Sequence, residues 1–120
     1  MADKKEVMVV DDEKDIRDTV KNILESEDYK VILAEDGDDA LKKLKDNKPD
    51  LILMDIMMPG TPVREVIKKI KDINIIFVSV VKTSEAEKEN LFKQDNVKGF
   101  VQKPFDTDYL IEKVKDALGE

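Results

Sequence analysis

The stretch from Leu51 to Pro59, which reads LILMDIMMP, decides the fold class of this chain. It is a short apolar run that contains one acid and is bounded by Pro49 and by the turn-forming pair Pro59-Gly60. Such a run fits a strand buried on both faces of a parallel sheet better than it fits a helix. The strand would carry Asp55 to its carboxyl end, and ligands bind at that edge of open α/β sheets. Asp55 is therefore the first candidate functional residue.

Apolar runs alternate with segments of helical periodicity along the whole chain. Strands are predicted at residues 7–10, 31–34, 75–81 and 97–101, and the third strand lies in the apolar run that begins at Leu51 and carries Asp55 to the sheet edge. Each is followed by a segment whose apolar residues recur at helical spacing. The residues expected to face the core from each of the five helices, in chain order, are Ile16, Val20, Ile23 and Leu24; Ala40, Leu41 and Leu44; Val63, Val66, Ile67 and Ile70; Ala86, Leu91 and Phe92; and Leu110, Ile111, Val114 and Leu118.

The helix starts carry their own signals. Pro62 suits the first turn of the third helix, Ser84 can cap a fourth helix that begins at Glu85, and Asp106 or Thr107 can cap the last. Five β/α units imply a parallel sheet with helices on both faces, because parallel strands need crossover connections. We predict an α/β, flavodoxin-like (βα)5 doubly wound sheet with strand order 2-1-3-4-5, forming one domain over residues 1–120.

Composition excludes several classes of function. The net charge of −7 argues against nucleic acid or an anionic membrane as a direct partner. The chain contains no Cys and no His, which excludes thiol chemistry, Ser-His hydrolysis and phosphohistidine on this chain. The sequence has no signal-peptide core and no run long enough to span a bilayer, so a cytoplasmic location is expected.

Three acids are predicted to meet at one edge of the sheet. In the chosen order the ends of strands one and three lie roughly 4.8 Å apart, which brings Asp11, Asp12 and Asp55 together. Like charges at this range destabilise one another unless a cation neutralises them, and oxygen ligands alone indicate Mg²⁺. Lys103 ends strand five, roughly 10 Å from Asp55, a gap that its side chain covers in large part. Ser79 ends strand four between them.

These groups suit a phosphoryl acceptor better than a hydrolase, because phosphoryl transfer needs in-line positioning and charge neutralisation. Asp55 would be the nucleophile, while Asp11 and Asp12 would hold the metal. Lys103 and Ser79 would bind the oxygens of the acyl phosphate. Each residue alone has a plain structural explanation: acids favour the first turn of a helix, for example. Their convergence on one corner of the sheet is what indicates a site.

The chain resembles the receiver domain of two-component response regulators from end to end, as in single-domain chemotaxis receivers. The matching residues are Val9–Glu13 (VVDDE), Met54–Gly60 (MDIMMPG), Ser79 and Lys103–Phe105 (KPF). The resemblance implies that Asp55 accepts a phosphoryl group from a sensor histidine kinase or phosphotransfer protein. Such a domain catalyses only its own phosphorylation and dephosphorylation, so we do not expect an enzyme.

The resemblance also implies the roles of the neighbouring residues. Asp12, Asp55 and the backbone carbonyl of Met57 would bind Mg²⁺, with Asp11 acting largely through water. Ser79 occupies the Ser/Thr switch position and Phe100 the aromatic switch position. The face made by the fourth helix, fifth strand and fifth helix would bind a downstream protein or form a homodimer.

The sequence departs from the family pattern in three places. Thr61-Pro62 replaces the usual Asp-Gly pair, and the third helix region is shorter by about one turn. Val80 follows Ser79 where a small residue is usual, and together with Met57 it would restrict access to the phosphate. Residues 95–99 stand where the family usually has a Gly-Ala type sequence leading into strand five.

Three alternatives remain. A Mg²⁺-dependent phosphohydrolase would also form an aspartyl phosphate on Asp55. Such enzymes generally have an Asp-x-Asp motif after the nucleophile strand, however, and this chain has Met57 in place of the second Asp. A flavin or nucleotide binder needs a phosphate loop, whereas Asp11–Glu13 repels phosphate. A pseudo-receiver would dock partners without being phosphorylated, which the altered third helix and Val80 would permit.

Overall fold

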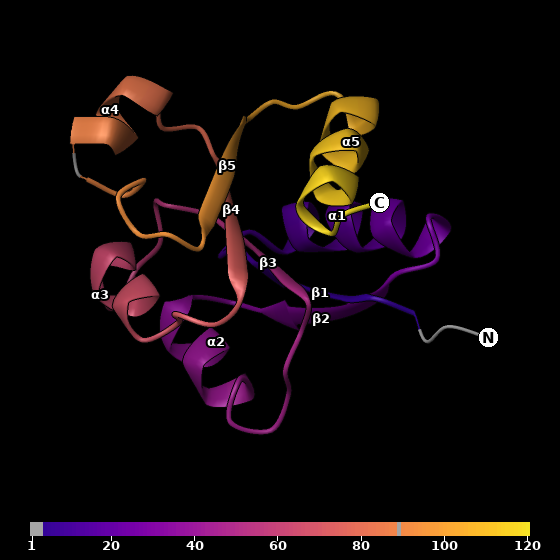
Figure 1. Ribbon diagram of the computed structural model, residues 1–120, viewed down its shortest axis with the longest axis horizontal. Coiled ribbons are helices and arrows are strands. Elements are labelled where there is room, and N and C mark those ends of the chain that lie inside the picture. The colour runs from indigo at the N-terminus through magenta and orange to yellow at the C-terminus, as the bar shows by residue number, and fades with distance from the viewer. Residues whose placement is uncertain (1–3, 89) are drawn as a thin grey trace.

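The computed structural model describes residues 4–88 and 90–120, in which strands and helices alternate strictly (Figure 1). The elements are β1 (Glu6–Val10), α1 (Lys14–Ser26), β2 (Lys30–Ala34), α2 (Gly37–Lys43), β3 (Leu51–Met54), α3 (Val63–Lys68), β4 (Asn74–Ser79), α4 (Thr83–Lys88), β5 (Val97–Gln102) and α5 (Thr107–Ala117). The predicted fold class is confirmed.

The five strands form one parallel sheet in the order β2-β1-β3-β4-β5. β1 and β3 are neighbours in register, with Val10 opposite Met54. The hydrogen bond from the N–H of Asp55 to the carbonyl of Val10, 2.9 Å long, continues this pairing one residue further. The strand order therefore sets the ends of β1 and β3 side by side at the carboxyl edge of the sheet.

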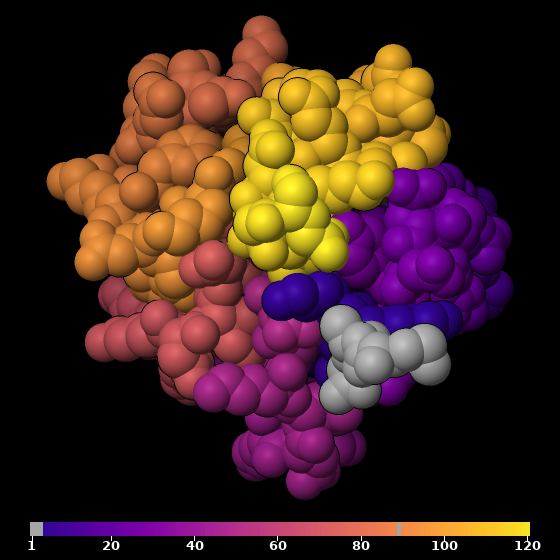
Figure 2. Space-filling view, turned by 45° about the vertical axis from the view of Figure 1, so that its right-hand side comes forward, coloured from indigo at the N-terminus to yellow at the C-terminus, as the bar shows by residue number. Residues whose placement is uncertain are grey.

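Helices cover both faces of the sheet (Figure 1). In β1, Met8 and Val10 pack into the cluster that includes α2, α3 and α4, whereas Val7 and Val9 pack into the cluster of α1 and α5. This alternation is the two-residue period of a strand buried on both sides. On the second face α1 and α5 also touch each other, and Figure 2 shows the yellow α5 lying against the purple α1.

The end of β4 differs from the prediction. β4 stops at Ser79 rather than Val81, because the last paired position is Ser79 opposite Gln102, after which β5 turns into Lys103-Pro104. Val80 consequently leaves the sheet and is 61% exposed. β5 continues one residue beyond the predicted end, to Gln102.

The boundaries of two helices also differ. α4 begins at Thr83, so Ser84 lies inside the helix and the prediction that it caps a helix starting at Glu85 is wrong. Leu91 and Phe92 follow α4 in a turn rather than on the helix. Pro62 immediately precedes α3 instead of lying in its first turn, and α3 is a short helix of six residues.

A buried amide ties the end of α3 to the start of β5. Asn96, 7% exposed, donates from Nδ2 to the carbonyls of Ile70 and Ile73, both at 2.6 Å. Its Oδ1 accepts from Nε2 of Gln94, which also reaches the carbonyl of Ile67 at 2.6 Å. These bonds give buried backbone carbonyls beyond the short helix the partners that helix geometry does not supply.

Replacing Asn96 by Ala is expected to lower the free energy of unfolding by about 2–3 kcal/mol, because buried carbonyls lose their donor. Asn47→Ala is the matched control, since its exposed Nδ2 donates to the carbonyl of Lys43, where water can replace it. Urea denaturation measures both variants, and the control should lose less than about 1 kcal/mol. Equal losses in the two variants would contradict this account.

Candidate phosphoacceptor site

The carboxylates of Asp11, Asp12 and Asp55 form one cluster at the carboxyl edge of the sheet. One oxygen from each lies within 4.8 Å of the others. Asp11 directly follows β1 and Asp55 directly follows β3, and both are buried, at 2% and 4% exposure. Asp12 is exposed, so the cluster opens to solvent on one side. The structure thus brings together the three acids that the sequence placed at adjacent strand ends.

Every polar group of Asp11 forms a hydrogen bond. Its N–H donates to the carbonyl of Ala34 in β2, and its Oδ1 accepts from the N–H of Glu13 at 2.9 Å. Its carbonyl accepts from Nη1 of Arg17 at 2.7 Å, and its Oδ2 accepts from Nζ of Lys103 at 2.5 Å. Four fixed contacts leave this carboxylate little freedom of orientation.

Lys103 reaches both buried acids. Its Nζ lies 2.5 Å from Oδ2 of Asp11 and 3.3 Å from Oδ2 of Asp55, and its side chain is 8% exposed. The backbone delivers it there because the N–H of Lys103 donates to the carbonyl of Ser79 at 2.9 Å, one residue beyond the last paired position of β4 and β5. The Lys103-Pro104 peptide bond is cis. The ammonium lies closer to Asp11 than to Asp55, which the sequence did not indicate.

The acids keep this lysine charged. Burial alone would lower the pKa of Lys103, but the hydrogen bond to Asp11 and the charges of Asp55 and Asp11 outweigh it and raise the pKa above its ordinary value. A raised lysine pKa gives stability that is complete below the unfolded value of about 10.5 and is lost as the pH rises through the folded value. Lys103 therefore stays charged throughout the neutral range.

Within the described residues, Ser79 and Phe100, the predicted switch residues, form no hydrogen bond with the acids of the cluster. Ser79 is fully buried, and its Oγ accepts from the N–H of Val81 at 3.3 Å. Phe100 is half-buried and packs edge-on against Phe92, at 6.1 Å between ring centroids. Both residues belong to the last two strands, so a shift of this edge would move them together.

Met57 contacts the cluster, whereas Val80 directly follows Ser79 at the end of β4. The N–H of Met57 donates to Oδ1 of Asp55 at 3.2 Å, so the loop after β3 folds back onto the acid. The side chains of Met57 and Val80 are 62% and 61% exposed.

Arg17 is the residue that the sequence analysis missed. It lies in the second turn of α1, where its N–H bonds back to the carbonyl of Glu13 and its guanidinium holds the carbonyl of Asp11. One signal was available: Arg17 falls one turn after the helix start, on the side where Ile16 also turns inward. Because a charged residue in that helix suits solvent equally well, the sequence could not select it.

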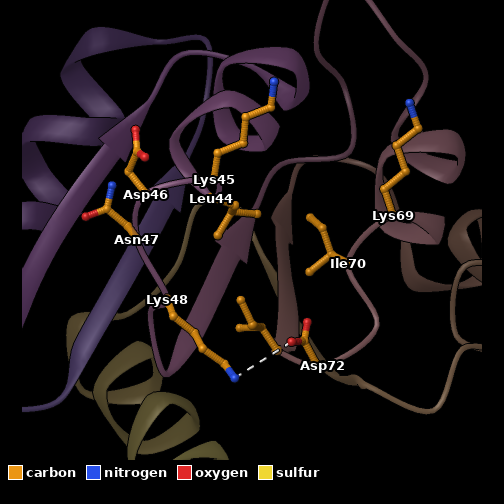
Figure 3. A pocket seen from close by; sticks show the side chains of 9 residues that line it. Leu44, Lys45, Asp46, Asn47, Lys48, Lys69, Ile70 and Asp72 are labelled. Carbon is orange, nitrogen blue, oxygen red and sulfur yellow. Dashed lines mark ion pairs between the residues drawn. The ribbon is translucent and has the colours of Figure 1, made fainter.

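A hollow on the opposite edge of the sheet is a different feature (Figure 3). It has a volume of about 470 Å³ and is lined by residues 44–48 and 69–73, which precede β3 and β4. Lys48 pairs with Asp72 across it at 3.8 Å, while the side chains of Lys45 and Lys69 project away from the floor. It lies at the amino ends of the strands and contributes nothing to the acidic cluster.

The donor set fits a hard divalent ion. Three carboxylates that converge on one point supply only oxygen ligands, which is the chemistry that Mg²⁺ prefers. The exposed side at Asp12 leaves room for water ligands, which Mg²⁺ retains.

No helix in the described residues is long and apolar enough to cross a membrane.

A doubly wound sheet with an acidic cluster and a buried lysine at its carboxyl edge defines a phosphoacceptor class of signalling domain. Residues 7–115 match the family model of the response regulator receiver domain, and the chain belongs to this family. Its acidic pocket fits the phosphoacceptor site of such domains. Receiver domains interact with histidine kinases and with downstream effectors.

Solved structures support the same assignment. The response regulator TrrA from Thermotoga maritima, in complex with Mg²⁺-BeF, is 38% identical over 95% of this chain and 99% of its own, with a TM-score of 0.81. The chemotaxis protein CheY4 of Vibrio cholerae is 28% identical over 96% and 99%, with a TM-score of 0.86. A CheY-like receiver domain from Methanospirillum hungatei is 28% identical over 97% and 94%, with a TM-score of 0.87.

Lys103→Met is expected to lower the free energy of unfolding by about 3 kcal/mol in a buffer without divalent ions, because two buried carboxylates lose their cation. Lys115→Met is the matched control. Its ammonium pairs with Glu27 at 3.1 Å on the surface and should contribute less than about 1 kcal/mol. Urea denaturation at pH 7 distinguishes them, and a loss at Lys103 no larger than at Lys115 would show that the cluster does not need its lysine.

Proposed function

We propose that Asp55 accepts a phosphoryl group from the phosphohistidine of a sensor histidine kinase or phosphotransfer protein. A carboxylate oxygen of Asp55 forms the new bond to phosphorus, the P–N bond breaks, and the imidazole nitrogen keeps the electron pair and takes up a proton. The observation that carries this proposal is the convergence of Asp11, Asp12, Asp55 and Lys103 on one point, in a chain that belongs to the receiver family.

The residues around Asp55 divide the remaining tasks. Asp12, Asp55 and the carbonyl of Met57 would hold Mg²⁺, with Asp11 reaching it through water. When bound, Mg²⁺ supplies positive charge to the phosphoryl oxygens. Lys103 is placed to transfer its hydrogen bonds from the carboxylates to a phosphoryl oxygen, since its ammonium already lies 3.3 Å from Oδ2 of Asp55. Buried donors that need no reorganisation stabilise such charge well.

The phosphorylated protein would act as a switch. The phosphoryl group adds about −1.5 to −2 charge where two acids are already buried, and this biases the domain between two conformations. Ser79 would move toward the phosphate and Phe100 would turn further inward. The face of α4, β5 and α5 would then bind a downstream protein or a second copy. We place this activity in the cytoplasm, without direct contact with nucleic acid or membrane.

Two other functions use the same residues. A phosphohydrolase would turn over small phosphate esters, but Met57 stands where such enzymes place a second acid. A pseudo-receiver would dock its partner without modification. Nothing in the geometry favours either alternative, since Asp55 keeps one side of its cluster open at Asp12. We propose that the protein catalyses only its own phosphorylation and dephosphorylation.

Incubation with acetyl phosphate and Mg²⁺ should add one phosphoryl group to the wild-type protein and none to Asp55→Asn, measured as intact mass. Asp50→Asn is the matched control, because it removes an exposed carboxylate at the opposite end of β3. This control should be phosphorylated like the wild type. Phosphorylation of Asp55→Asn, or none of the wild type, would contradict the proposal, and continuing release of phosphate would favour the hydrolase.

Val80→Ala should increase the rate of phosphorylation by acetyl phosphate severalfold, because it removes exposed apolar bulk next to Ser79. Val80→Thr keeps the shape of the side chain and should leave the rate close to that of the wild type. Intact mass followed over time measures both variants. An unchanged rate in Val80→Ala would show that this side chain does not limit access.

A further inference from the structure

The loop from Ile56 to Thr61 connects the phosphoacceptor strand β3 to α3, and it is held at two points. At its start, the N–H of Met57 donates to Oδ1 of Asp55. At its end, Thr61 donates its hydroxyl to Oδ1 of Asp38 at 2.6 Å and its N–H to Oδ2 of the same carboxylate at 3.3 Å. Within residues 4–88 and 90–120, no other hydrogen bond joins this loop to a separate helix.

Asp38 comes from α2, a helix that the sequence separates from the loop by 23 positions. The carboxylate lies close to the loop backbone: Gly60 has a φ of +91°, and a Cβ at this position would lie 2.9 Å from Oδ2 of Asp38. The neighbouring Gly37 is equally close to α3, because a Cβ there would lie 2.5 Å from Cγ2 of Val66. The first turn of α2 therefore contacts both the loop and the helix that follows it.

Ile56 and Met58 pack against the hydrophobic core, but the end of the loop has few other polar contacts that fix its backbone. α3 is six residues long, and Pro62 at its start forms no side-chain cap. Pro62 also lacks an N–H, so it adds no donor at this point. Met57 and Gly60 are exposed to solvent. A short exposed loop samples several conformations unless specific bonds select one, and Thr61 with Asp38 supplies two bonds to one charged acceptor.

We propose that Thr61 and Asp38 are positioning residues, which hold the β3–α3 loop so that the backbone of Met57 is in place for Mg²⁺ beside Asp55. This inference rests on the proposed function, in which the carbonyl of Met57 is a metal ligand. Thr61 lies four positions after Met57, and the loop bonds to Asp55 at its other end. Without the Asp38 contact, Mg²⁺ must order the loop as it binds, which weakens binding.

The test compares Thr61→Val, which removes the hydroxyl at nearly constant shape, with Thr61→Ser, which keeps it. Mg²⁺ binding is followed by NMR titration of the backbone amides, and amide hydrogen exchange is measured for residues 57–61. Thr61→Val should raise the Mg²⁺ dissociation constant by about three- to tenfold and speed exchange in the loop. Thr61→Ser should stay within about twofold of the wild type.

Three further variants separate positioning from charge. Asp38→Ala should weaken Mg²⁺ binding as Thr61→Val does, and the double variant should be no weaker than the single ones, because both remove the same contact. Glu65→Gln removes an exposed charge from α3, where it pairs with Lys68, and should leave Mg²⁺ binding unchanged.

The outcomes are distinct. Thr61→Val with wild-type affinity and wild-type exchange would overturn this inference and leave the phosphoacceptor proposal intact. Equal weakening in Glu65→Gln and Asp38→Ala would show a general charge effect and would also overturn it. A wild-type protein that binds no Mg²⁺ would overturn both proposals.

Discussion

The structure depends on a concentration of negative charge that one lysine compensates. Asp11 and Asp55 are buried side by side because β1 and β3 are neighbours in the sheet, and Asp12 extends the cluster to the surface. Two buried carboxylates at this range are unstable without a cation. Lys103 supplies it from β5, two strands from β3, so the fifth strand is needed electrostatically as well as for packing.

The ammonium of Lys103 contacts the two buried acids unequally. Its ammonium lies 2.5 Å from Asp11 and 3.3 Å from Asp55, while Arg17 and the N–H of Glu13 fix Asp11 from the other side. Additional negative charge on Asp55 would compete for the same ammonium. The backbone N–H of Lys103 bonds to the carbonyl of Ser79, so the lysine is connected directly to the end of β4. The proposed switch residues lie on this edge.

Much of this architecture could be predicted from the sequence, because apolar runs and helical periodicity are strong signals. Those signals predicted five β/α units, and the choice of the flavodoxin-like strand order, which the structure confirms, then predicted that Asp11, Asp12 and Asp55 meet. The end of β4 and the start of α4 did not, because Val80 and Val81 read as strand while pairing with β5 stops at Ser79. Contacts such as Arg17 with the carbonyl of Asp11 and Thr61 with Asp38 join residues whose types suit solvent equally well, so only three-dimensional packing reveals them.

The most direct test is a crystal structure of the protein with Mg²⁺ and beryllofluoride, which mimics a bound phosphoryl group. The account predicts a beryllofluoride attached to a carboxylate oxygen of Asp55, a metal ion beside it contacting Asp12, and the ammonium of Lys103 bonded to fluoride. Beryllofluoride attached to another acid, or Lys103 still bonded only to Asp11 with a metal bound elsewhere, would contradict it.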